Sequence, residues 1–228
     1  MNGDKKETFA GEPNGVTRSY GKIYVTNTGS RTDVFDAETY EFITCIGTGT
    51  WGEGGYQTVH AFDVTASQGA VFIRDKRKLV VVLEQDVQPG SAARVPIYSR
   101  SVNLQEAMGT YAVAARNDGF LYVTAQNKNI IYLFDPADIR AGDTGFAPYL
   151  VTLGFEKSPQ SIAFVGDRLF VTLRVDDKRS ELWEISPKNG KLLQDFTDSM
   201  VYPEKIAGAR HTLLVVDRAT QTVKAIGL

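Results

Sequence analysis

The chain has 228 residues and a mass of 25.1 kDa, and its 25 Lys and Arg residues nearly balance its 27 Asp and Glu residues. This balance argues against a nucleic-acid-wrapping protein, which would carry a strong basic excess, and a hydrophobic content of 43% argues against a disordered acidic tail. No run approaches the roughly 18 apolar residues of a membrane helix. The single cysteine excludes an internal disulfide framework and any cysteine-rich metal site.

An apolar residue, a polar turn and an alternating apolar run recur five times along the chain. In chain order, the five copies span residues 14–27, 63–75, 112–126, 161–174 and 205–218. The first apolar residues of the copies follow one another at intervals of 44–49 residues, and they are Val16, Val64, Val113, Ile162 and Ile206. Each copy predicts a β-hairpin, because its arms alternate with period two and its turn carries Gly, Asn or Asp.

A second hairpin follows most copies, as in DVFDAETYEFITCIG (33–47) after copy one and SELWEISPKNGKLLQDF (180–196) after copy four. Four strands of about six residues with connections of about five make a unit of about 45 residues. Five such units predict an all-β fold, a β-propeller of five four-stranded blades, in preference to a β-sandwich. The expected repeats of this single domain, 1–228, are approximately 12–59, 60–108, 109–157, 158–201, and 202–228 together with 4–11.

The last copy ends after its third strand, so it lacks an outer strand of its own. Residues 4–11 (DKKETFAG) precede the first copy and have no place in it. We expect this segment to complete the last blade, which would remove two exposed strand edges.

Residues 11–57 resemble an NHL-type propeller repeat. The resemblance lies in Pro13 before the first strand, the strand end GKIYVTNTG, the VFD of the third strand, and the glycine-punctuated exit IGTGTWGEGGYQ. It implies a β-propeller of the bacterial surface or periplasmic type and a binding role. NHL-type propellers usually have six blades, and the repeats here number five. One fold hosts many functions, so the resemblance implies no particular ligand.

In a propeller, the loops that enter each blade and those that join its second and third strands gather on one face, which is the usual binding site. Polar groups with aromatic platforms suit a sugar or a peptide, and Trp51, Tyr56 and Tyr111 offer such platforms. The candidate ligand-binding residues of this face are Asn27, Arg31, His60, Asp75, Tyr111, Gln126, Gln160, Arg174, Asp217 and Arg218. The alternative interpretation is that these side chains are solvated loop ends without a ligand.

Catalytic signals are weak. There is no GxSxG nucleophile elbow, and His60 and His211 fall on opposite faces of the predicted propeller, so we assign no catalytic residue. Cys45 lies in an outer strand and is interpreted as a packed thiol. We therefore favour a non-catalytic module that binds a glycan, a peptide or a protein partner, as a monomer and without a cofactor.

The alternative function is a hydrolase or lactonase-like enzyme with a divalent cation at the channel mouth. Oxygen ligands for Ca²⁺ or Mg²⁺ would be Asn27, Asp75, Glu204 and Asp217. Arg174 and Arg218 lie nearby in register and would repel a cation. Neither nucleic-acid binding nor membrane insertion is expected. Residues 1–20 hold no apolar signal region, and the family resemblance favours a periplasmic or surface location with the export signal outside this chain.

Overall fold

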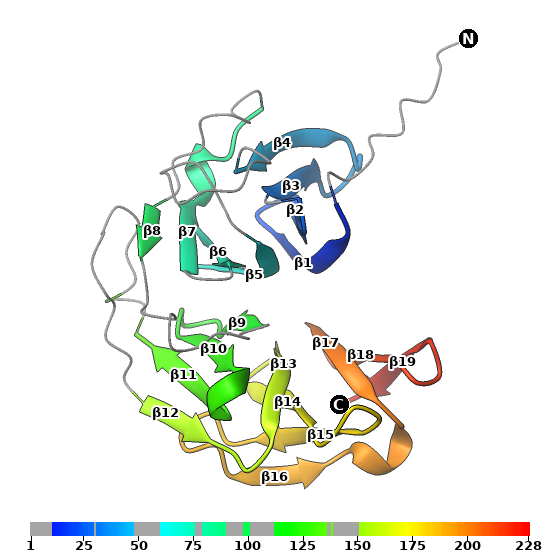
Figure 1. Ribbon diagram of the computed structural model, residues 1–228. Coiled ribbons are helices and arrows are strands. Elements are labelled where there is room, and N and C mark those ends of the chain that lie inside the picture. Colours follow the sequence, from blue (N-terminus) through cyan, green and yellow to red (C-terminus); the bar gives the residue numbers. More distant parts are fainter. Residues whose placement is uncertain are drawn as a thin grey trace. The chain divides into compact units, whose positions relative to one another are not determined.

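The computed structural model describes residues 11–29, 31–47, 60–75, 79–89, 98–100, 112–135, 138 and 151–228. Its strands form five consecutive antiparallel sheets, and within each sheet every strand pairs with the next one along the chain (Figure 1). This is the five-bladed β-propeller that the repeats predict. The chain divides into two compact units, of which unit 1 carries β1–β8 and unit 2 carries β9–β19.

Unit 1 holds the first two sheets. The first consists of β1 (Pro13–Ser19), β2 (Lys22–Asn27), β3 (Arg31–Asp36) and β4 (Phe42–Ile46), and the second of β5 (Ala61–Ser67), β6 (Ala70–Asp75), β7 (Leu79–Leu83) and β8 (Tyr98–Arg100). A short 3₁₀ helix, η1 (Glu84–Asp86), follows β7.

Unit 2 holds the other three sheets. The third sheet consists of β9 (Val113–Ala115), β10 (Leu121–Ala125), β11 (Ile130–Phe134) and β12 (Val151–Gly154), with η2 (Gln126–Lys128) after β10. The fourth consists of β13 (Ser158–Val165), β14 (Arg168–Arg174), β15 (Ser180–Ile185) and β16 (Leu192–Asp195), followed by η3 (Thr197–Ser199). The fifth has three strands among the described residues, namely β17 (Pro203–Ala209), β18 (Thr212–Asp217) and β19 (Thr222–Gly227). The predicted closing strand at 4–11 lies, apart from Gly11, outside the described residues, and it stays a prediction.

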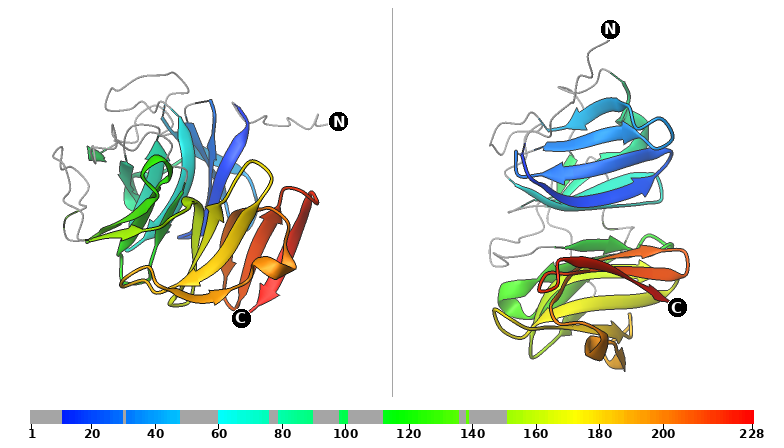
Figure 2. Two further views of the ribbon diagram at one scale, coloured as in Figure 1. Left: turned by 60° about the horizontal axis from the view of Figure 1, so that its bottom comes forward. Right: turned by 90° about the vertical axis from the view of Figure 1, so that its right-hand side faces the viewer.

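Tight turns produce the meander that Figure 2 shows within each sheet. Tyr20 and Gly21 join β1 to β2 with φ angles of 52° and 70°, and Gln68 and Gly69 join β5 to β6 with 49° and 76°. Two successive residues with positive φ make a type I′ turn, whose twist matches that of the flanking strands. Glycine is the second residue of both turns because it adopts this conformation without steric cost.

Each unit is held together by apolar packing between neighbouring sheets. In unit 1, Tyr24 and Val34 of the first sheet pack with Ile73 and Val80 of the second, and all four side chains are fully buried. Burying an apolar side chain of this size contributes roughly 1.5–3 kcal/mol. Val16 lies on the opposite face of the first sheet and is 62% exposed, because successive residues of a strand point to opposite faces.

In unit 2, one cluster joins the third and fourth sheets and another joins the fourth and fifth. Phe170 of β14 and Leu213 of β18 are fully buried in the second cluster. The backbones of β13 and β17 also approach closely, since a Cβ at Gly208 would lie 1.8 Å from the carbonyl oxygen of Phe164. Only glycine fits there.

None of the helices in the described parts of the chain is long and apolar enough to cross a membrane.

Candidate functional site

A β-bulge recurs near the start of the first strand in four of the described sheets. In each, one residue is skipped in the pairing with the second strand, and the skipped residues are Asn14, Phe62, Gln160 and Glu204. A bulge bends the strand and re-aims the extra side chain. Two of the bulges, in unit 2, thereby supply side chains to the pocket described below.

Threonines of the second strands fix the backbone beside these bulges. The N–H of Gly15 donates to Thr26 Oγ1 at 2.9 Å, and the N–H of Ser161 donates to Thr172 Oγ1 at 3.0 Å. The hydroxyl of Thr172 in turn donates to the carbonyl oxygen of Glu204 at 3.1 Å. The fourth sheet is therefore bonded directly to the bulged residue of the fifth.

In the first, second and fifth sheets, the second strand ends in a buried polar residue. These residues are Asn27, Asp75 and Asp217. These residues face Pro13, Ala61 and Pro203, the residues immediately before the bulges. All three side chains are inaccessible to solvent. Asp217 accepts hydrogen bonds from the N–H groups of Val201, Tyr202 and Ala219, at 3.1, 3.1 and 3.2 Å.

The candidates of unit 1 bond to neighbouring groups of the same unit. The side-chain amide of Asn27 donates to Asp33 Oδ2 at 3.0 Å, and its oxygen accepts from the N–H of Gly29 at 3.0 Å. Arg31 pairs with Asp33 at 2.7 Å. These contacts order the turn between β2 and β3.

Asp75 and His60 also lie together in unit 1. Asp75 Oδ1 accepts the backbone N–H of His60 at 3.1 Å. The imidazole of His60 stacks on the ring of Phe62, with centroids 5.8 Å apart. His211 lies in the turn between β17 and β18, as the repeats predict.

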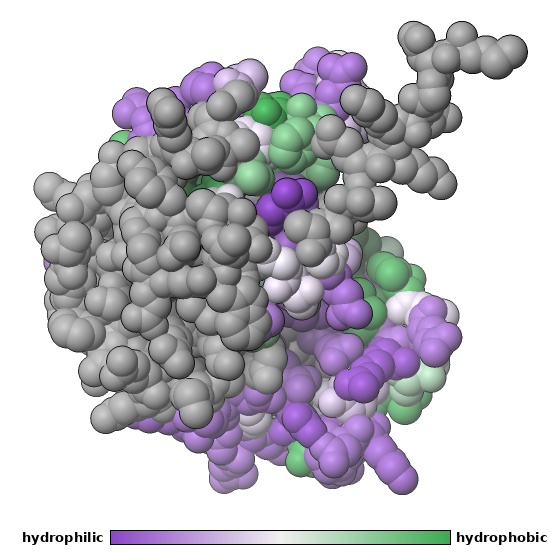
Figure 3. Space-filling view, turned by 45° about the horizontal axis from the view of Figure 1, so that its top comes forward, coloured by the Kyte–Doolittle hydropathy of each residue, from purple (hydrophilic) through white to green (hydrophobic). Residues whose placement is uncertain are grey.

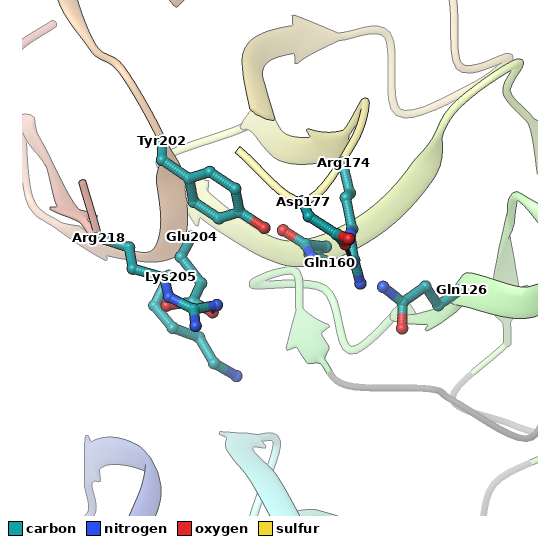
Figure 4. Close-up of a pocket in the computed structure, with 8 residues that line it drawn as sticks. All are labelled: Gln126, Gln160, Arg174, Asp177, Tyr202, Glu204, Lys205 and Arg218. Atoms are coloured by element: carbon teal, nitrogen blue, oxygen red, sulfur yellow. Dashed lines mark hydrogen bonds and ion pairs between the residues drawn. The ribbon is translucent and has the colours of Figure 1, made fainter. Parts of the chain in front are cut away.

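Four of the ligand-binding candidates, together with one residue from the alternative metal set, line one pocket in unit 2. The pocket has a volume of about 350 Å³, and its lining side chains are Gln126, Gln160, Arg174, Asp177, Tyr202, Glu204, Lys205 and Arg218 (Figure 4). They come from all three sheets of the unit. Every lining residue carries a polar or charged group, so the pocket suits a hydrophilic ligand.

Two structural positions supply most of this lining. Each of three lining residues directly follows a buried residue in the last two positions of a second strand. These lining residues are Gln126 after Ala125, Arg174 after Leu173 and Arg218 after Asp217. Gln160 and Glu204 are the bulged residues of β13 and β17. The repeat thus places equivalent residues of neighbouring sheets around a common hollow.

The charges of the pocket are arranged as two ion pairs and one further cation. Arg174 pairs with Asp177, and Arg218 Nη1 lies 3.3 Å from Glu204 Oε1. Both pairs are exposed to solvent, with the Arg218 side chain 65% accessible, so each contributes at most about 1 kcal/mol to stability. Within the part of the chain that the structure describes, Lys205 pairs with no carboxylate.

Tyr202 forms one wall of the pocket and is only 4% exposed. The guanidinium of Arg218 lies over its ring, 5.7 Å from the centroid, a cation–π arrangement. The N–H of Arg218 donates to the carbonyl oxygen of Tyr202 at 2.9 Å. Asp217 therefore fixes the backbone of Tyr202, and Arg218, the residue after Asp217, covers the ring of Tyr202.

The Asp217 carboxyl is kept ionised by these contacts. Burial by itself would raise its pKa, but the N–H groups of Val201 and Tyr202 and the ammonium of Lys224, 3.5 Å away, favour the carboxylate. The net result is a pKa below the ordinary value for aspartic acid.

A second hollow of about 400 Å³ adjoins the first in unit 2. It is lined by Gln126, Asn127, Asn129, Ser158, Arg174 and Val175. Because both hollows share Gln126 and Arg174, a ligand larger than the first pocket can extend over these two side chains.

Tyr202, Lys205 and Asp177 are pocket residues that the sequence analysis missed. The sequence contained a usable signal for Tyr202. His60 and Tyr202 each lie directly before the first strand of a sheet, so both repeats carry a ring side chain at the same position. No repeat-wide signal marks Lys205 or Asp177. The candidate Tyr111 and the aromatic residues Trp51 and Tyr56 lie outside the described residues.

The alternative metal set falls into both units, with Asn27 and Asp75 in unit 1 and Glu204 and Asp217 in unit 2. Among the residues with a described position, no three His, Cys, Asp or Glu side chains cluster in a way that could hold a metal ion. The thiol of Cys45 is buried in β4, where burial raises its pKa.

No family model and no curated protein matches the sequence. Solved structures match over most of the chain. Virginiamycin B lyase from Staphylococcus aureus aligns with a TM-score of 0.60 and 12% identity, over 97% of this chain and 71% of that one. The computationally designed Ika8 protein aligns with a TM-score of 0.52 and 11% identity, over 97% of this chain and 72% of that one.

The WD40 β-propeller domain of Doa1 aligns with a TM-score of 0.58 and 12% identity, over 92% of this chain and 62% of that one. The fold is a β-propeller. Identities of 11–12% show the fold alone, because propellers of unrelated function share it.

Proposed function

We propose that this chain is a non-catalytic binding module that holds a glycan, a peptide or a protein partner at the pocket of unit 2. The observation that carries this proposal is the convergence of equivalent residues, Gln126, Arg174 and Arg218, from three successive sheets on one polar hollow. Loops placed by a rigid β-scaffold are the usual location of binding residues. The NHL-type resemblance of residues 11–57 belongs to the same proposal.

The lining itself favours binding over catalysis. Arg174 and Arg218 are each paired with a carboxylate, and the lining residues that the structure describes include neither histidine nor cysteine. Its amides, carboxylates and guanidinium groups suit hydrogen bonding to a hydrophilic ligand. The divalent-metal hydrolase stays the alternative prediction, and it is tested below by metal removal.

The test is a binding screen on the full chain with neutral monosaccharides, acidic monosaccharides and short peptides, followed by ligand-observed NMR. We expect at least one hydrophilic probe to bind, and the variant Gln160→Ala to weaken that binding. Lys188→Ala is the control, because Lys188 is an exposed cation in the turn between β15 and β16 and lies outside the pocket. Equal loss in both variants would contradict the pocket as the binding site, and no binding by any probe would contradict a monosaccharide or short-peptide ligand.

A further inference from the structure

The pocket of unit 2 carries an excess positive charge. Its lining includes three cations, Arg174, Lys205 and Arg218, and two carboxylates, Asp177 and Glu204. Each carboxylate is already paired with an arginine. Lys205 is the cation that no carboxylate of the described residues neutralises, so the pocket is matched to a ligand with one negative charge.

The positive charge of Lys205, unpaired among the described residues, lies at one end of the pocket. Figure 4 shows Lys205 beside Glu204 and Arg218, whereas Gln126 lies at the other end. Arg218 is largely exposed and its pair with Glu204, at 3.3 Å, is loose. A ligand carboxylate at Lys205 can therefore also accept a charge-assisted hydrogen bond from Arg218.

The remaining lining groups are neutral and suit hydroxyl groups. Gln126 and Gln160 each offer an amide that both donates and accepts hydrogen bonds. Figure 4 shows the hydroxyl of Tyr202 pointing toward Gln160. Figure 4 shows Gln126 and Gln160 toward Arg174, on the side of the pocket away from Lys205, where they suit the ring hydroxyls of a sugar.

A peptide fits this lining less well. Two common modes of peptide recognition use main-chain pairing with a strand edge or apolar side chains in hydrophobic grooves. Among the described lining residues, the only large apolar surface is the ring of Tyr202, and it is covered by the Arg218 guanidinium. The volume of about 350 Å³ is at the small end of the range for small-molecule sites.

We propose that this pocket binds a sugar acid, with the carboxylate at Lys205 and Arg218 and the hydroxyl groups at Gln126 and Gln160. This inference rests on the proposed binding function and names its ligand class. It requires that carboxylate and hydroxyl groups are both recognised, so neither a simple carboxylate nor a neutral sugar should bind comparably.

The experiment is isothermal titration of the full chain with glucuronate and galacturonate, against glucose, galactose, acetate and a tripeptide with a free carboxylate. We expect at least one of the two uronates to bind about tenfold or more tightly than its neutral counterpart, since a hydrogen bond to a charged group is stronger than one between neutral groups. Its affinity should fall as NaCl is raised, because exposed charges are screened.

Two variants locate the carboxylate. Lys205→Gln should weaken the uronate by about tenfold and leave the weak binding of the neutral sugar unchanged, whereas the control Lys188→Gln should change neither. Circular dichroism and the unfolding midpoint of each variant verify its fold.

Each other outcome overturns a defined part of the inference. Equal affinity for the uronates and the neutral sugars would contradict the sugar acid and leave the binding module standing. Equal affinity for acetate would reduce the site to a bare anion site, and tighter binding of a tripeptide with a free carboxylate would assign the pocket to peptides. Binding of no probe would contradict the sugar acid, and the wider screen described for the proposed function would then decide whether the pocket binds another ligand.

Discussion

The second sheet, in unit 1, and the fifth sheet, in unit 2, each have a buried aspartate at the equivalent position, but the surroundings of the two aspartates differ. Asp75 and Asp217 both end a second strand, both are inaccessible to solvent, and both accept the backbone N–H of the residue before the first strand. In the fifth sheet that residue is Tyr202, which lines the pocket. In the second sheet it is His60, whose ring stacks on another side chain of its own sheet.

The aspartate at this repeated position is therefore part of the scaffold in both sheets. In the fifth sheet, the groups that line the pocket are its neighbours, Arg218 one residue later and Glu204 on the bulge. Side chains alternate between the faces of a strand, so a shift of one residue separates a buried group from an accessible one.

The largest effect is expected from Gly208→Ala, which breaks the packing of the fifth sheet on the fourth. The new Cβ would meet the backbone carbonyl of Phe164 at 1.8 Å, and overpacking of this kind costs about 1–3 kcal/mol or more. The measurement is the free energy of unfolding in urea. Gly154→Ala is the control, since a Cβ there meets nothing within 4 Å; equal midpoints for the two variants would contradict the close approach.

The next largest effect on stability is expected from substituting the two buried aspartates, Asp217 and Asp75. Asp217→Ala and Asp75→Ala each leave buried backbone N–H groups without an acceptor, which costs about 1–3 kcal/mol. Only Asp217→Ala should also weaken ligand binding, because Asp217 holds the backbone of Tyr202. Asp217→Asn keeps one acceptor oxygen and should restore part of both losses. The comparison fails if Asp75→Ala reduces binding as strongly as Asp217→Ala.

Acid should remove the contribution of Asp217. Its folded pKa lies below the ordinary value, which is about 3.9 for a free aspartate. The carboxylate therefore stabilises the folded state fully above the ordinary pKa, and this stability is lost as the pH falls through the folded pKa. We expect the difference in unfolding free energy between the wild type and Asp217→Asn to shrink between pH 5 and about pH 2. A constant difference would mean that the negative charge makes no contribution.

The smallest effect is expected from metal removal. For a binding module without a cation, the unfolding midpoint should not change with EDTA or with added Ca²⁺. A cation that binds only the folded state would stabilise it by about 2.7 kcal/mol at one hundred times its dissociation constant. A midpoint that falls with EDTA and returns with Ca²⁺ would favour the hydrolase alternative and place its ligands among residues such as Glu204 and Asp217.

Much of the architecture could be predicted from the sequence because hydrophobic alternation and turn residues are local signals. The five hairpins that begin near Val16, Val64, Val113, Ile162 and Ile206 all appear, and the sheets that contain them follow in order. Strand order in a meander needs no long-range information, since each strand pairs with its neighbour along the chain.

The site was less accessible to prediction, although four of its candidates, Gln126, Gln160, Arg174 and Arg218, line one pocket. The sequence placed Asp217 beside Arg218 as if both were exposed, whereas the pairing of Pro203 with Asp217 buries the aspartate. Tyr202 and Lys205 carry no motif of their own. Their role depends on the turn before β17 and on the bulge at Glu204.

The repeat, the order of the hairpins and the polar character of the strand ends can all be read from the amino-acid sequence. Tertiary structure decided which of those polar groups are buried and which line a pocket. The physical reason is that a bulge and its register exist only once two strands have paired, and a one-residue shift then turns a side chain from one face to the other. Glu204 and Gln160 reach the pocket through such a shift.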